Sequence, residues 1–179
     1  MAKQNVTFSN PILNDEIEIL SESEESLVFK TTLLPQSGQT QKHYHTKITE
    51  VFKVISGELQ VFINNKPFLL KENETRQISP FTKHQFYNPT NKTVVFKVTV
   101  NTPGKLREGL QIMYGLAEDG KVYKNGLPKN ILLMAIALQK MDTYVPNIPR
   151  GVQNSGITVL AFLGKTLGLE QKLLRKYCT

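Results

Sequence analysis

Between residue 26 and about residue 101, hydrophobic and polar residues alternate in short runs that are separated by residues typical of turns. The clearest run is TVVFKVTV at 93–100, where Val94, Phe96, Val98 and Val100 would share one face of a strand. Other runs end at glycine, proline or asparagine residues, as in NNKP and NTPG. Many short strands of this kind predict an antiparallel sandwich or barrel rather than a parallel α/β sheet.

After Pro103 the spacing of hydrophobic residues changes from two to three or four. This period predicts a helix over 105–120 that ends at Gly120. Residues 128–144, PKNILLMAIALQKMDTY, open with a proline near a helix start and are apolar on nearly every side. Residues 156–177 predict one or two further helices, interrupted at glycines.

The chain is therefore expected to be mainly β, with a β-barrel domain over 1–104 and a helical C-terminal extension over 105–179. The apolar helix over ILLMAIALQKM needs cover, which either its own barrel or a second subunit can provide. We expect a homodimer.

Composition narrows the class of protein only moderately. The 179 residues suffice for one domain with a sizeable core, and the hydrophobic and charged fractions are those of a globular protein. The N-terminus shows no secretory signal pattern, and the single cysteine, Cys178, fits a reducing compartment, so a cytoplasmic location is expected.

The net charge of +7 is concentrated in the C-terminal segment. Residues 1–104 hold 11 Lys/Arg against 10 Asp/Glu, whereas residues 105–179 hold 11 against 5. No arginine cluster or interleaved aromatic residues accompany this charge, so we interpret it as a solvated helical face and expect no nucleic acid partner. Contact of the basic helices over 156–177 with an anionic membrane surface is the alternative.

The three histidines of the chain and one glutamate form the candidate site. His43 and His45 are two residues apart, so a strand presents both imidazoles on the same face. Glu50 follows five residues after His45, and an unbroken strand would turn it to the opposite face, so we predict a turn or bulge within TKIT. With His84 from a later strand, these residues would form one pocket that binds a metal and a small molecule. Further residues are expected to line this pocket: Phe52, Gln60, Phe62, Phe81 and Phe86, with exposure to solvent as the alternative for Gln60.

Residues 38–101 resemble the conserved barrel of the cupin superfamily. Its first motif, G-x5-H-x-H-x3-4-E-x6-G, is matched by His43, His45, Glu50 and Gly57. Its second motif, G-x5-P-x-G-x2-H-x3-N, is matched by His84 and Asn88.

The departures from these motifs concern turn residues. Gly38 is displaced by one position, and Asn73 stands at the first glycine of the second motif. Ser79 replaces the proline, and Phe81 replaces the second glycine, which would affect the turn before His84 and narrow the mouth of the cavity.

The resemblance implies a jelly-roll barrel in which His43, His45, Glu50 and His84 bind one metal ion. Three imidazoles and a carboxylate suit a divalent first-row metal, namely Fe, Mn, Ni, Co, Cu or Zn. Four protein ligands leave two positions open on a six-coordinate ion. The resemblance implies an oxidoreductase of the dioxygenase type, or an isomerase, acting on a small organic substrate. The alternatives are a small-molecule-binding or sensory module and a structural dimer stabilised by the metal.

Overall fold

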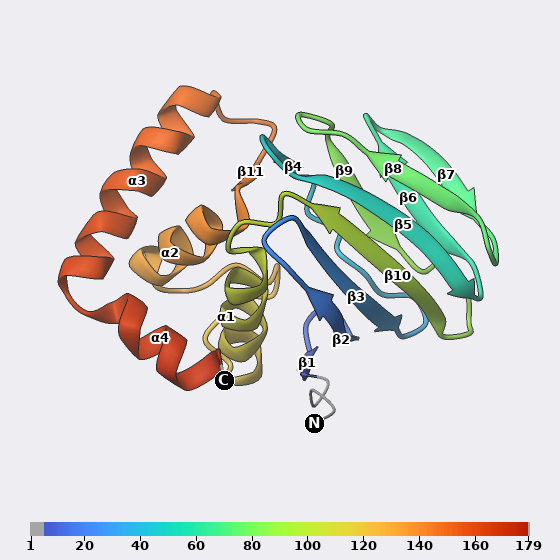
Figure 1. Cartoon of the computed structure of the whole chain (residues 1–179), viewed down its shortest axis with the longest axis horizontal. Coiled ribbons are helices and arrows are strands. Elements are labelled where there is room, and N and C mark those ends of the chain that lie inside the picture. Colours follow the sequence, from blue (N-terminus) through green and yellow to red (C-terminus); the bar gives the residue numbers. More distant parts are fainter. Residues whose placement is uncertain (1–5, 179) are drawn as a thin grey trace.

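A six-stranded antiparallel sheet forms one wall of the protein (Figure 1). The computed structural model describes residues 6–178. The strands follow one another across the sheet in the order β1 (Thr7–Asn10), β2 (Asp15–Glu22), β3 (Ser26–Leu33), β10 (Val94–Asn101), β5 (Thr49–Ser56) and β8 (Thr75–Ile78).

A three-stranded antiparallel sheet forms the opposite wall. It consists of β7 (Lys66–Leu70), β6 (Leu59–Ile63) and β9 (His84–Tyr87), in that order. A short strand, β4 (Tyr44–His45), pairs with β11 (Thr143–Tyr144), which comes from the C-terminal part of the chain. The fold is therefore the mainly β jelly roll that the sequence predicts.

Alternation of hydrophobic residues builds the core between the walls. In β10 the side chains of Val94, Phe96, Val98 and Val100 are all buried, as their spacing predicts. β10 is central because it pairs with β3 on one side and with β5 on the other.

Four helices follow the barrel and lie together on one side of it (Figure 1). Their bounds are α1 (Leu106–Glu118), α2 (Ile131–Met141), α3 (Arg150–Thr166) and α4 (Leu169–Tyr177). α3 begins six residues before the predicted start at 156, and Gly168, with a φ of 70°, separates α3 from α4. Within residues 6–178, no helix combines the length and hydrophobicity needed to cross a membrane. The cytoplasmic location stays a prediction.

The helices and the barrel share buried side chains. Leu106 and Tyr114 of α1 and Met141 of α2 belong to the same apolar cluster as the barrel strands. The apolar helix α2 is covered within its own chain, since it packs against both α1 and α3. Gly164 permits this packing, because a Cβ at that position would lie 2.7 Å from the side chain of Ile136. The division into units 1–104 and 105–179 stays a prediction.

Candidate metal centre and cavity

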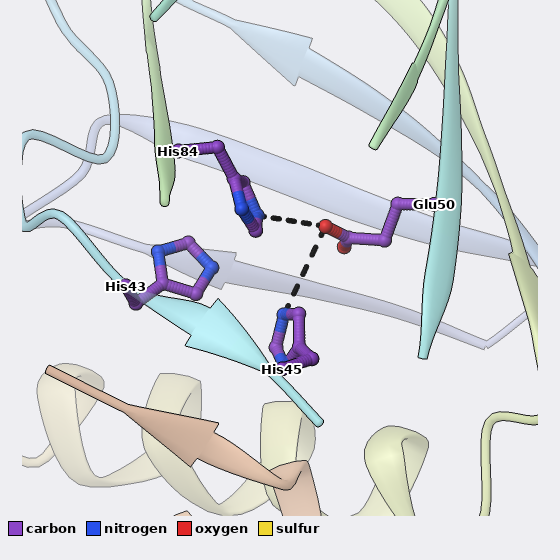
Figure 2. Close-up of side chains that lie close together, drawn as sticks. All are labelled: His43, His45, Glu50 and His84. Atoms are coloured by element: carbon purple, nitrogen blue, oxygen red, sulfur yellow. Dashed lines mark ion pairs between the residues drawn. The ribbon is translucent and has the colours of Figure 1, made fainter. Parts of the chain in front are cut away.

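Four side chains from three separate strand regions converge at one point (Figure 2). They are His43, His45, Glu50 and His84, and all four are buried. One nitrogen or oxygen atom of each lies within 4.8 Å of the corresponding atoms of the others. The histidines at 43 and 84 are also joined through their backbones, by a pair of hydrogen bonds of 3.1 and 2.9 Å.

The β-strand is interrupted between His45 and Glu50, as the odd spacing of these two residues predicts. β4 ends at His45 and β5 begins at Thr49. The break is held by the Asp142 carboxylate, which accepts hydrogen bonds from the backbone N–H groups of Thr46 (2.7 Å) and Lys47 (2.8 Å). The Thr46 hydroxyl donates a third bond of 2.8 Å to the same carboxylate. Beyond the break the side chain of Glu50 faces the histidines.

Backbone carbonyls orient all three imidazole rings. The Nδ1 atom lies 3.2 Å from the Gln41 carbonyl in His43 and 2.9 Å from the Thr82 carbonyl in His84. In His45 it lies 3.1 Å from the carbonyls of both Met141 and Asp142. A carbonyl only accepts, so each ring carries its proton on Nδ1 when neutral and leaves the lone pair of Nε2 free. This tautomer is the one that a metal ligand needs.

The two residues that replace glycines of the second motif, Asn73 and Phe81, adopt the left-handed backbone conformation that glycine favours. Phe81 has a φ of 63° and Asn73 a φ of 67°, both in the left-handed region. Asparagine tolerates this conformation, whereas phenylalanine adopts it at a cost in strain. The N–H of Phe81 donates to the His45 carbonyl over 2.7 Å, which holds the turn before His84 in place.

Charge is concentrated between Glu50 and His84. Glu50 Oε2 lies 2.8 Å from His84 Nε2 and 3.8 Å from His45 Nε2 (Figure 2). Burial opposes ionisation of the carboxyl, but the adjacent His84 and the other two imidazoles lower the pKa of Glu50 to about 2. Burial and the neighbouring imidazoles hold the pKa of His43 well below its usual value. Burial also lowers the pKa of His84, but the Glu50 carboxylate outweighs this effect and raises it.

These residues fit a resident metal ion. Glu50 Oε2 and His84 Nε2 are buried, and neither has a hydrogen-bond partner with acceptable geometry among residues 6–178. Buried polar atoms without partners are costly, and a cation between them would satisfy both. Three nitrogen donors and one carboxylate oxygen match the preferences of divalent first-row metals.

A cavity of about 200 Å³ adjoins the metal centre. Phe52 and Phe86 line it, next to His43, His45 and Glu50. Side chains of α1 and α2 form another part of the wall. They are Leu106, Leu110, Met113, Tyr114, Leu138 and Met141.

Three residues expected in the cavity lie elsewhere. Gln60 and Phe62 alternate along β6 with the buried Leu59 and Val61, so their side chains lie on the outer face of the small sheet. Phe81 is 56% exposed and lies in a surface groove with Tyr44 and the 146–150 segment. The turn before His84 points Phe81 outward, so it does not narrow the cavity.

Sequence reasoning missed the contribution of residues 141 and 142. Their carbonyls orient His45, and the Asp142 side chain holds the break after it, although nearly a hundred residues separate them in the chain. A local signal exists only for the backbone: Asp142 ends α2 in the left-handed conformation, with a φ of 48°. Nothing in the sequence indicates what its carboxylate contacts.

A family model described as a cupin domain matches residues 29–101. This part of the chain is a cupin domain. The match includes all four residues that converge at the candidate metal centre and ends just before α1. The helices therefore lie outside the matched region.

Three solved structures that are similar to this chain share little of its sequence, and their TM-scores lie below 0.5. A sugar phosphate isomerase of the cupin superfamily from Silicibacter pomeroyi is 18% identical, with a TM-score of 0.49 over 54% of this chain and 71% of that chain. The cupin domain of Schizosaccharomyces pombe Cnp3 is 13% identical, with a TM-score of 0.47 over 50% of this chain and 65% of that chain. A predicted oxalate decarboxylase from Thermotoga maritima is 21% identical, with a TM-score of 0.46 over 49% and 79%. No curated protein sequence matches the chain significantly.

Proposed function

We propose that this cupin is a metal-dependent oxidoreductase, of the dioxygenase type, that acts on a small organic substrate. The observation that carries the proposal is the set of four buried donor atoms within 4.8 Å of one another, beside a cavity. When bound, a divalent first-row ion supplies Lewis acidity or an oxygen-binding centre. The chain supplies the four ligands, the fixed tautomers of the imidazoles and a largely apolar pocket.

The residues that line the cavity favour a reaction that is shielded from bulk water. Five of these residues are apolar side chains of the barrel: Phe29, Phe52, Phe86, Phe96 and Val98. A dry site strengthens the electrostatic effect of a bound ion and protects reactive intermediates from side reactions. The cavity volume of about 200 Å³ restricts the substrate to a small molecule.

The test combines metal analysis with oxygen consumption. Mass spectrometry of the purified protein identifies the resident metal, and an oxygen electrode then measures uptake with enediols, flavonoids and thiols as substrates. We expect iron, manganese, nickel, cobalt or copper, with uptake that His45→Ala abolishes. Resident zinc without oxygen uptake would contradict the oxidoreductase proposal, and turnover without oxygen would favour an isomerase.

A binding or sensory module is the second candidate, and the attachment of His45 to the helices favours it. The carbonyls at the end of α2 orient this ligand, and α1 and α2 line the cavity. A bound molecule would therefore contact both the metal centre and the helices. Ligand binding without turnover, accompanied by a change in hydrogen exchange of α1 and α2, would support this candidate.

We also propose that the protein forms a homodimer through α3. This helix exposes large apolar side chains along its length, at Val152, Val159, Phe162 and Leu163, and Leu167 directly after its end is exposed too. Exposed apolar surface of this kind is typical of an interface. Sedimentation of the full chain tests the proposal. Flotation with anionic vesicles by a monomeric protein would favour membrane-surface contact instead, and a dimer that dissociates on chelation would favour a structural metal.

A further inference from the structure

A buried carboxyl group lies in the cavity away from the metal centre. Asp15, the first residue of β2, is only 5% exposed and lines the cavity together with Tyr114 of α1. The Tyr114 hydroxyl donates a hydrogen bond of 2.7 Å to Asp15 Oδ2. The other oxygen, Oδ1, is buried and has no hydrogen-bond partner among residues 6–178.

The register of the large sheet places Asp15 and Glu50 at different ends of the cavity. Glu50 pairs with Val100 of β10, whereas Asp15 pairs with Leu33, which pairs with Val94 of β10. The two polar groups therefore belong to rows six residues apart along β10. The wall between them is mostly apolar and includes Ile17, Phe29, Phe96 and Val98.

The orphaned oxygen is suited to a ligand. Leaving a buried acceptor unpaired is costly, and Oδ1 has no partner within the described chain. Burial raises the pKa of Asp15 to about 7, although the Tyr114 hydroxyl acts in the opposite direction. Near neutral pH the group therefore exists both as a carboxylate and as a carboxylic acid. A ligand hydroxyl suits both forms, because it donates to the first and accepts from the second.

We propose that Asp15, oriented by Tyr114, is a second binding position of the cavity and hydrogen-bonds through Oδ1 to a hydroxyl group of the substrate. The substrate is then a small molecule with an apolar middle, a metal-binding group at the metal centre and a hydroxyl at the other end. The metal-binding group rests on the proposed metal-dependent function, whereas the hydroxyl position rests on Asp15 alone. Asp15 is in this view a specificity-determining residue.

Matched pairs of carboxylates test the proposal on the full-length protein loaded with Mn²⁺. The probes are ω-hydroxycarboxylates of increasing chain length, each paired with the unsubstituted carboxylate of the same length, and their binding is measured by isothermal titration calorimetry. At the length that reaches Asp15, we expect the hydroxylated compound to bind roughly tenfold more tightly. Equal affinities within every pair would overturn the proposal, and if no carboxylate binds, the titration with simple alcohols described below decides it.

Two substitutions separate ligand binding from a structural role. Asp15→Asn keeps a hydrogen-bonding group of the same shape and should keep the preference for the hydroxyl, whereas Asp15→Leu should abolish it. A preference that persists in Asp15→Leu would overturn the proposal. Should Asp15→Leu fail to fold, Tyr114→Phe serves instead: loss of the orienting bond should reduce the preference, and an unchanged preference would count against the proposal.

Simple alcohols distinguish this inference from the metal-dependent function. Their binding to the metal-free protein is measured by NMR titration in the wild type, Asp15→Asn and Asp15→Leu. Binding that requires the hydrogen-bonding side chain supports the Asp15 position even when the protein binds no metal and no carboxylate. Metal and carboxylate binding without any dependence on residue 15 would leave the metal centre intact and overturn the Asp15 position.

Discussion

The barrel and the helical region contribute to the candidate site in different ways. The barrel supplies all four proposed metal ligands, His43, His45, Glu50 and His84. The helical region supplies none of these four residues. At the end of α2, however, the backbone carbonyls of Met141 and Asp142 orient His45, and the Asp142 carboxylate holds the interruption of the strand before Glu50. Apolar side chains of α1 and α2 line the cavity. Ligand identity is therefore a property of the barrel, whereas ligand orientation depends on both regions.

Removing a barrel ligand should have the largest effect. His45→Ala deletes one of four donors, and we expect metal affinity to fall at least a hundredfold, since loss of an outer contact alone typically costs about ten- to a hundredfold. Bound metal is measured by mass spectrometry after dialysis, with circular dichroism as a check on folding. Gln60→Ala, on the outer face of β6, is the control and should retain its metal. Unchanged stoichiometry in His45→Ala would contradict the ligand assignment.

Burial of Asp15, where the barrel meets Tyr114 of α1, should make stability depend on pH. Folding raises the pKa of Asp15 from 3.8 to about 7, so between these values the folded protein holds a proton that the unfolded chain releases. The associated stability is present at low pH and is lost as the pH rises. Between pH 5 and 7 we expect the free energy of unfolding to decrease by about 2 kcal/mol from this group.

This contribution is measured by urea denaturation of the metal-free wild type and of metal-free Asp15→Asn at pH 5 and pH 7. The change in the free energy of unfolding between the two pH values is compared between the two proteins. Tyr114, which faces Asp15 from α1, stays protonated over this range because burial raises its pKa well above 10. The other titrating groups are common to both proteins. Parallel pH profiles of the two proteins would show that Asp15 keeps its ordinary pKa.

Removing an orienting contact from the helical region should weaken metal binding less than removing a ligand. Asp142→Ala leaves the N–H groups of Thr46 and Lys47 without their acceptor, and we expect metal affinity to fall about tenfold. Asp142→Asn should have an intermediate effect, because it keeps one acceptor oxygen and tolerates the left-handed backbone. Asp119→Asn, which removes a carboxylate that accepts hydrogen bonds from Lys121, Lys176 and Tyr177, should have none. Equal metal affinity in all three variants would show that the barrel orients its ligands alone.

The smallest effect on the metal centre is expected at α3. Phe162→Lys places a charge on the exposed apolar face, and we expect the dimer to dissociate at least about tenfold more readily. Metal affinity should not change, because α3 contributes no side chain to the candidate ligand set. Analytical ultracentrifugation measures the dimer, with Leu69→Lys, an exposed residue of β7, as the control. A wild type that sediments as a monomer would contradict the dimer proposal.

Several features of the site followed from local spacing. The i, i+2 pattern of His43 and His45 gives both rings the same face, and the odd spacing to Glu50 requires a break, which lies between β4 and β5. The alternation in β10 correctly assigns its buried face. The same reasoning did not place Gln60 and Phe62, because periodicity shows which side chains share a face but not which face meets the cavity. The place of Phe81 in the second motif predicts it at the cavity mouth, and it lies on the surface instead.

The sequence by itself determined the jelly-roll class, the cupin resemblance and the residues proposed as ligands, because these depend on short-range spacing within a strand. Only the tertiary structure decided that Met141 and Asp142 hold His45, that α1 and α2 cover the cavity, and that Tyr114 meets Asp15. Each of these contacts joins residues about a hundred positions apart in the chain. Such contacts depend on how the helices pack against the sheet, and hydrophobic periodicity does not encode that arrangement.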